Sequence, residues 1–213
     1  MKHPGESRPT QDPAALIESA ARLPVHLEPE QAEALLFFER LLVDRAVPLG
    51  LMARGDAPAV RERHILDSLR AVLALESSDV DAYDLGSGSG LPGIVVAIAM
   101  PSLRVGLVEA RSRRAGFLEL AVERLELANV AVLAKPADQL GVAVDVCFAR
   151  ALAPLPEAWK LARDLLRPGG RLVYFAGEGF QRPDPMPPDA SSFRPLQTPV
   201  LASSGPLAIM TRQ

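Results

Sequence analysis

Cysteine is nearly absent from this chain of 213 residues, and neither sign of charge dominates it. The single cysteine, Cys147, excludes an intrachain disulfide and a zinc site built from several cysteines. Because Cys147 lies in an apolar run, we interpret it as a buried strand residue rather than a nucleophile. The net charge of −3 excludes a bulk polycation, so binding to nucleic acid would require a local basic patch.

Long apolar runs are also missing. No stretch reaches the roughly 18 residues of a membrane span, and the polar, proline-bearing N-terminus does not have the pattern of a signal peptide. We therefore expect a soluble, cytoplasmic monomer that has no membrane or metal partner. Residues 1–13 are expected to form a disordered tail, residues 14–76 an N-terminal helical cap, and residues 77–213 the main domain.

Prolines divide the expected cap into three helices. Asp12 and Pro13 cap a helix over residues 14–22, Pro29 opens a second that stops at Pro48, and Pro58 opens a third that runs to about Leu75. From Val80 onward, strands and helices are expected to alternate. The strands are expected at residues 80–85, 104–108, 130–133, 144–149 and 171–176, and the helices at residues 93–99, 113–127 and 154–166.

Alternation of this kind predicts an α/β fold with a parallel sheet and right-handed crossovers. Ligands then bind beyond the carboxyl ends of the strands. Residues 193–197 and 207–211 are expected to close the sheet as an antiparallel hairpin.

A glycine turn follows the first strand, where Gly86, Gly88 and Gly90 stand at alternate positions. Glycine accepts positive φ and lets a ligand approach the backbone closely. Pro92 suits the first turn of the helix that follows, because its missing N–H would be unpaired there. The order strand, glycine turn, helix therefore predicts a cofactor site.

Two cofactors fit this turn. The spacing Gly88-x-Gly90-x-x-Gly93, with Glu109 about 20 residues further on, matches a dinucleotide fingerprint. Counted from Asp84 at the strand end, the same turn resembles the first motif of class I S-adenosylmethionine (SAM) methyltransferases. A turn that only packs the helix on the strand is the third possibility.

Two features favour SAM. Residues 167–172 read Arg-Pro-Gly-Gly-Arg-Leu and resemble the turn before strand five of those enzymes. The chain also lacks a second domain that could hold the substrate of a dehydrogenase.

Several motifs together resemble one family. They are His-Ile-Leu-Asp-Ser at 64–68, the Gly-Leu-Pro-Gly-Ile turn at 90–94, Arg114 with Phe117 and Leu118, Ala137-Asp138, and residues 149–155. With these motifs the chain is similar to the 16S rRNA guanine-N7 methyltransferases, also called the glucose-inhibited division protein B family, as a divergent member. The resemblance implies a Rossmann-like class I fold, SAM as cofactor, and N7 of a guanine in 16S rRNA of the small ribosomal subunit as acceptor.

The resemblance also implies roles for individual residues. The three glycines Gly86, Gly88 and Gly90 would wrap the methionine and ribose parts of SAM, with Leu91 packed beside them. Glu109 would accept hydrogen bonds from the ribose hydroxyls, unless it is a solvated acid at the strand end.

Four more residues complete the expected site. Ala137 and Asp138 would meet the adenine edge, although Asp138 fits a turn or a helix cap equally well. Asp84 would orient the turn or the SAM amine. Arg150 would position cofactor or substrate, or form an ion pair with an acid on the rim.

Guanine N7 has a lone pair and no proton, so its methylation needs orientation rather than a general base. The chain departs from the family pattern at Gly50, Met52, Pro136 and Ala176, which are usually polar positions. Two alternatives are therefore a diverged enzyme with another substrate, small molecule or RNA, and a protein that binds SAM without turnover.

Local charge offers two arginine clusters for RNA, one within residues 54–70 and one within residues 104–124, unless both are solvated helix faces. His64, Asp67 and Ser68 share one helix face. They are expected either to join the cap to the core behind the cofactor turn or to anchor the helix by hydrogen bonds.

Overall fold

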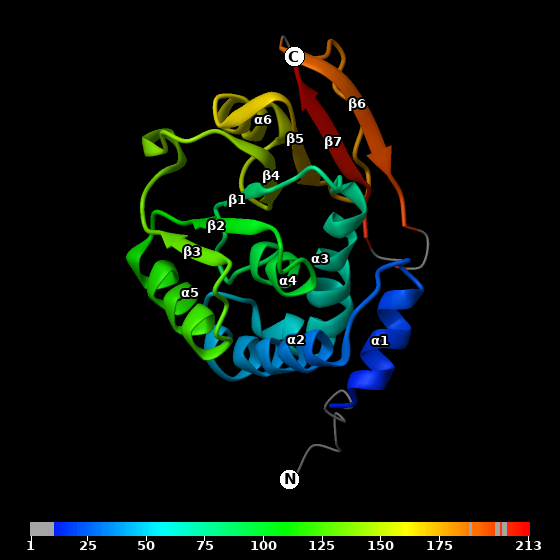
Figure 1. The fold of residues 1–213 in the computed structure, drawn as a ribbon, viewed down its shortest axis with the longest axis vertical. Helices are drawn as coiled ribbons and strands as arrows, with labels where there is room; N and C mark the ends of the chain where they lie inside the picture. The colour runs from blue at the N-terminus through cyan, green and yellow to red at the C-terminus, as the bar shows by residue number, and fades with distance from the viewer. Residues whose placement is uncertain (1–10, 188, 199–200, 202–203) are drawn as a thin grey trace.

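A seven-stranded sheet forms the centre of the molecule (Figure 1), and the computed structural model describes residues 11–187, 189–198, 201 and 204–213. The strand order is β3-β2-β1-β4-β5-β7-β6. The strands are β1 (Asp81–Leu85), β2 (Arg104–Val108), β3 (Val130–Leu133), β4 (Val144–Arg150), β5 (Leu166–Phe175), β6 (Ala190–Leu196) and β7 (Leu207–Arg212). Strands β1 to β5 run parallel, and β7 pairs antiparallel with β5 and β6. The expected α/β class and the closing hairpin are both confirmed.

The central strands are buried on both faces, as strands of a parallel sheet with helices on both sides usually are. In β4, Val146 and Phe148 face one apolar core, and Cys147 and Ala149 face the other. Cys147 is fully buried, and burial raises the pKa of its thiol well above the ordinary range. It is therefore a packing residue, as expected.

Helices cover the two faces unequally. One face carries α4 (Gly93–Ala99), α5 (Ser112–Arg124) and the N-terminal helices α1 (Pro13–Ala21) and α2 (Pro29–Leu41), which share one apolar core with the sheet. The other face carries α6 (Leu155–Arg163), whose Trp159 is buried. The N-terminal region thus packs directly on α4, and its division from the main domain at residue 76 stays a prediction.

The third expected helix is helical but irregular. It consists of a 3-10 helix (Arg54–Ala59), a π-helix (Arg61–Leu66), the α3 turn (Asp67–Leu69) and a second 3-10 helix (Arg70–Ala74). The expected helix from Pro58 to about Leu75 is therefore helical over nearly all of its length, but it is not a regular α-helix. Irregular helical turns of this kind are common near functional sites.

The boundaries around β5 also differ from expectation. The helix before it ends at Arg163, and β5 begins at Leu166, five residues earlier than expected. The glycine pair of the expected turn forms an irregularity within the strand, where the pairing with β4 shifts register. Gly169 has φ +79°, and a Cβ at Gly170 would lie 2.8 Å from the Arg167 carbonyl oxygen. The sequence pattern at Gly169 and Gly170 does not distinguish a bulge within a strand from a turn before it.

The expected disordered tail over residues 1–13 lies only partly within the described residues. Asp12 accepts a hydrogen bond from the Ala14 N–H and caps α1, so helix begins at Pro13, inside the expected tail. Residues 1–10 lie outside the described residues. In the described part of the chain, no helix is long and apolar enough to cross a membrane.

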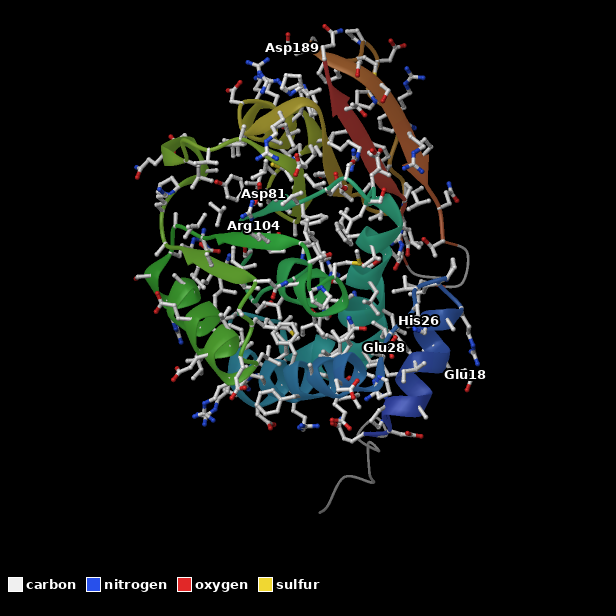
Figure 2. All side chains as sticks on the ribbon, viewed as in Figure 1. Glu18, His26, Glu28, Asp81, Arg104 and Asp189 are labelled. Carbon is white, nitrogen blue, oxygen red and sulfur yellow. The ribbon has the colours of Figure 1, made fainter. Side chains whose placement is uncertain are left out.

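Arg70 ties the N-terminal region to the segment before β7. Its side chain is 1% exposed, and it donates hydrogen bonds to Asp67 (2.5 Å), the Thr198 hydroxyl (2.8 Å) and the Gly205 carbonyl (2.7 Å). A buried charge is tolerated only when such partners surround it. Figure 2 shows, for contrast, Asp81 and Arg104 at the starts of β1 and β2, where the Arg104 side chain is 69% exposed.

We expect Arg70→Met to lower the free energy of unfolding by about 3 kcal/mol, because it removes one member of a buried ion pair. Urea denaturation followed by circular dichroism measures the loss. Arg104→Met is the matched control, since an exposed pair contributes less than about 1 kcal/mol. Equal losses in the two variants would contradict this account.

Candidate functional site

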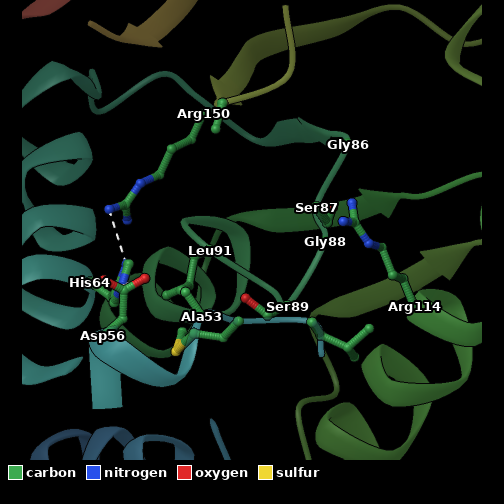
Figure 3. A pocket seen from close by; sticks show the side chains of 13 residues that line it. Ala53, Asp56, His64, Gly86, Ser87, Gly88, Ser89, Leu91, Arg114 and Arg150 are labelled. Carbon is green, nitrogen blue, oxygen red and sulfur yellow. Dashed lines mark hydrogen bonds and ion pairs between the residues drawn. The ribbon is translucent and has the colours of Figure 1, made fainter. Parts of the chain in front are cut away.

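A pocket of about 270 Å³ opens beyond the carboxyl ends of β1 and β4 (Figure 3). The chain continues from β1 to β2 and β3 on one side and returns to β4 and β5 on the other, so β1 and β4 flank the topological switch point. Open α/β sheets bind their ligands at that point. The pocket is lined by Leu51, Met52, Ala53, Asp56, His64, Gly86, Ser87, Gly88, Ser89, Leu91, Arg114, Arg150 and Ala151.

The glycine turn forms one wall of this pocket. Gly86, Gly88 and Gly90 have φ of +69°, +58° and +90°, which side-chain-bearing residues rarely adopt. Gly86 and Gly88 line the pocket together with Leu91, whereas Gly90 is buried behind the turn. A Cβ on Gly90 would lie 2.5 Å from the Ile94 side chain. Gly86 and Gly88 thus expose backbone to a ligand, while packing requires glycine at Gly90 and also at Gly86, where a Cβ would lie 2.6 Å from the Leu152 side chain.

Asp84 connects the glycine turn to the start of α4. Its carboxylate accepts a hydrogen bond from the Gly93 N–H at 3.1 Å, and its side chain is 1% exposed. Burial disfavours the charged form and raises the pKa of Asp84 to about 7. Asp84 therefore supports the turn and does not line the pocket.

Glu109 lies at the end of β2 and braces the other side of the turn. It is 5% exposed and is therefore not a solvated strand-end acid. Its two oxygens accept hydrogen bonds from the Gly88 N–H (3.1 Å) and the Arg111 N–H (2.9 Å), and the Arg114 guanidinium lies 3.6 Å away. A carboxylate offers about four acceptor positions, so capacity remains for ligand hydroxyls.

Arg150 ends β4 on the opposite side of the pocket (Figure 3), and its guanidinium is held by the N-terminal region. It forms an ion pair with Asp67 (3.1 Å) and donates to the Arg63 carbonyl (2.7 Å) and the Ser68 hydroxyl (3.2 Å). Burial lowers the pKa of Arg150 below its ordinary value. The expected cap-to-core contact through His64, Asp67 and Ser68 is confirmed, and Arg150 is its partner.

Other predicted residues lie outside the pocket lining. Ala137 and Asp138 lie on a short 3-10 helix (Ala137–Gln139), where Asp138 is exposed and makes no capping hydrogen bond. Among the positions that depart from the family pattern, only Met52 lines the pocket. Gly50 and Pro136 are exposed, and Ala176 is buried after β5.

Sequence reasoning missed Asp56 as a site residue. Asp56 lies within the first arginine cluster, and it lines the pocket with its Oδ2 3.5 Å from His64 Nε2. Its position in an irregular helix hid the spacing that would have placed both side chains on one surface. Among the described residues, no group of three or more His, Cys, Asp or Glu side chains is arranged to hold a metal ion.

The first arginine cluster is not a free basic patch. Arg61 pairs with Glu39 at 2.9 Å, Arg63 pairs with Asp56 at 2.9 Å, and Arg70 is buried. In the second cluster, Arg111 at the N-cap of α5 and Arg113 in its first turn are both exposed, beside the pocket wall formed by Arg114. Three arginines of the first cluster are thus paired or buried, although Arg54 is exposed, and the second cluster is the stronger candidate for an RNA-binding patch.

Comparison with known sequences identifies relatives of this chain. The sequence profile of the family described as rRNA small subunit methyltransferase G matches residues 31–182. A relative from Thermobifida fusca, named ribosomal RNA small subunit methyltransferase G, is 40% identical over 72% of this chain and 69% of its own length. Relatives with the same name from Acidiphilium cryptum and Burkholderia pseudomallei are 40% and 36% identical over 67% and 80% of this chain. These two alignments span 66% and 76% of the relatives' lengths.

Solved structures share the fold. A SAM-dependent methyltransferase from Aquifex aeolicus has a TM-score of 0.53 at 16% identity, over 78% of this chain and 97% of its own. TrmN from Thermus thermophilus has a TM-score of 0.53 at 19% identity, over 71% of this chain and 53% of its own. The expected class I methyltransferase fold is thereby confirmed.

The raised pKa of Asp84 predicts a pH dependence of stability. Between the ordinary value of 3.8 and about 7, the folded chain keeps a proton that the unfolded chain releases. Rising pH therefore disfavours the folded state in this window, by up to about 1.4 kcal/mol per pH unit.

Asp84→Asn removes this proton and preserves an acceptor for the Gly93 N–H. We expect the variant to gain about 2 kcal/mol in free energy of unfolding relative to the wild type between pH 5 and pH 7. Urea denaturation at both pH values measures the change, with the exposed Asp44→Asn as control. A constant difference between Asp84→Asn and the wild type would show that Asp84 is already charged at pH 5.

Proposed function

Because the chain belongs to the rRNA small subunit methyltransferase G family, we propose that it transfers the methyl group of SAM to N7 of a guanine in small-subunit rRNA. The profile match carries this proposal, because it runs from α2 past β5 and so includes the pocket walls and the strands behind them. The proposal includes 16S rRNA of the assembled subunit as partner. A monomer acting in the cytoplasm stays a prediction.

The residues around the pocket fit SAM. The turn presents the backbone of Gly86 and Gly88 to the cavity, and a Cβ at Gly88 would meet nothing closer than 3.7 Å, so a ligand can lie against it. Glu109 has acceptor capacity left for a ribose diol. Leu91 offers an apolar contact on the same wall. When bound, SAM supplies a methyl group on a sulfonium sulfur, which is an activated donor.

The protein then has to orient the acceptor. Guanine N7 already holds its lone pair, so the site has no proton to remove and needs no general base. Burial and the nearby Arg150 cation lower the pKa of His64 and keep it neutral, and its acceptor nitrogen Nδ1 is occupied by the Arg150 guanidinium at 3.2 Å, so His64 is not placed to take a proton from the acceptor. Catalysis here consists of holding donor and acceptor in line, which accounts for large rate effects without acid–base chemistry.

Met52 supports a second candidate function, in which the methyl acceptor is not guanine. It brings a thioether to the pocket wall at a position where the resemblance leads us to expect a polar residue. A diverged enzyme with another substrate, or a protein that binds SAM without turnover, is thus the second candidate.

The test uses tritiated SAM and small ribosomal subunits from a strain that lacks this guanine methylation. We expect label in 7-methylguanosine after digestion of the RNA. Binding of SAM without label in the RNA would instead favour the second candidate, and the search would move to other acceptors.

Gly88→Ala tests the cofactor wall separately from folding. We expect SAM affinity to fall about tenfold or more, equivalent to about 1.4 kcal/mol, because the new methyl group enters the cavity. Gly50→Ala is the matched control, since Gly50 also has positive φ (+69°) and open space around it but does not line the pocket. Isothermal titration calorimetry measures both. Equal SAM affinity in both variants would show that Gly88 does not line the SAM site.

A further inference from the structure

Resting on the proposed function, we propose that Asp56 and His64 bind the Watson–Crick edge of the target guanine and so select this base. Both line the pocket from the N-terminal region, on the side of Arg150 and across from Arg114 (Figure 3). His64 Nε2 and Asp56 Oδ2 are 3.5 Å apart. A donor and an acceptor therefore stand next to each other at the same end of the cavity.

Arg150 fixes His64 as a donor. A guanidinium has only donors, so the contact of 3.2 Å between Arg150 Nη2 and His64 Nδ1 makes Nδ1 the acceptor and puts the proton on Nε2. His64 Nε2 is buried and has no hydrogen-bond partner among the described residues. Asp56 Oδ2 lies 3.5 Å away, which is longer than an ordinary hydrogen bond, so an acceptor on the ligand would satisfy this buried N–H better than the protein does.

Asp56 has acceptor capacity left. Its Oδ1 accepts one hydrogen bond from the Arg63 guanidinium at 2.9 Å, and its Oδ2 makes only a long contact of 3.5 Å with His64 Nε2. The Asp56 side chain is 22% exposed, within a wall that also contains the apolar residues Leu51 and Met52. A partly dry carboxylate in an apolar wall is suited to receive N–H donors.

Guanine matches this pair in its pattern of donors and acceptors. Its Watson–Crick edge presents the O6 acceptor followed by the N1–H and N2–H donors. His64 Nε2–H would donate to O6, and the Asp56 carboxylate would accept from N1–H and N2–H. Adenine and cytosine place an amino donor where His64 also donates, and uracil places an acceptor opposite Asp56.

The same arrangement leaves the reacting atom free. N7 lies on the major-groove edge of guanine, away from N1 and N2. Arg150, which could otherwise bind N7 and block it, is committed to Asp67, Ser68 and the Arg63 carbonyl. Arg150 therefore acts as a positioning residue for His64, and the base is read by its neighbours.

Asp56→Asn tests the carboxylate, because it keeps the shape and replaces an acceptor oxygen by a donor. We expect kcat/KM for small-subunit RNA to fall about ten- to a hundredfold, while the Kd for SAM changes by less than about twofold. Glu62→Gln is the matched control, since Glu62 is exposed on the next turn and does not line the pocket. An Asp56→Asn enzyme as active as the control overturns the proposal. A parallel loss of SAM affinity also overturns it, because the carboxylate would then serve the SAM ammonium group.

A second measurement changes the target base instead of relying on the variant alone. Small subunits are reconstituted on 16S RNA transcribed with a minor share of inosine, which keeps O6, N1–H and N7 but lacks the N2 amino group. We expect the wild type to label guanosine at least about tenfold more efficiently than inosine at the target position, and Asp56→Asn to lose this preference. Equal labelling by the wild type overturns guanine recognition through N2. Absence of label from both nucleosides, with SAM still bound, refutes the guanine acceptor itself and this recognition with it.

Discussion

The contact between Arg150 and the N-terminal helical region is the interaction on which the site depends. Arg150 ends β4, and its guanidinium is bound by Asp67, Ser68 and the carbonyl of Arg63 while it lies over the ring of Phe175. These contacts bring an irregular helical segment to the edge of the sheet. Without them, the glycine turn would face solvent on one side, and the pocket would lose the wall that contains Asp56 and His64.

The sheet was predictable because its signals are local. β1 to β4 each carry a short apolar run, and glycine, proline and asparagine mark their ends, so the observed bounds agree closely with those expected. The failures arose where local signals are ambiguous. Gly169 and Gly170 have the pattern of a turn, but pairing with β4 makes them an irregularity inside β5. The irregular helical turns after Pro58 follow from tertiary contacts that no propensity encodes.

The site was predictable on its cofactor side and less so on its acceptor side. Glycine spacing and the acid at the end of β2 are sequence motifs, and the structure joins them through the hydrogen bond from Gly88 to Glu109. The other wall is assembled from residues far apart in the chain, such as Arg150 and His64. Charge counting failed for the same reason, since Arg61 pairs with Glu39, and Arg70 donates to Thr198 and the Gly205 carbonyl, which only the fold brings near.

The most direct test of this account is a crystal structure of the protein with S-adenosylhomocysteine, the product of the donor. The account predicts that the ligand lies along Gly86 and Gly88, with its ribose hydroxyls on Glu109 and its sulfur facing the wall that contains Asp56. A ligand bound elsewhere on the sheet would contradict it. So would a ribose that makes no contact with Glu109, because the buried carboxylate would then serve only the turn.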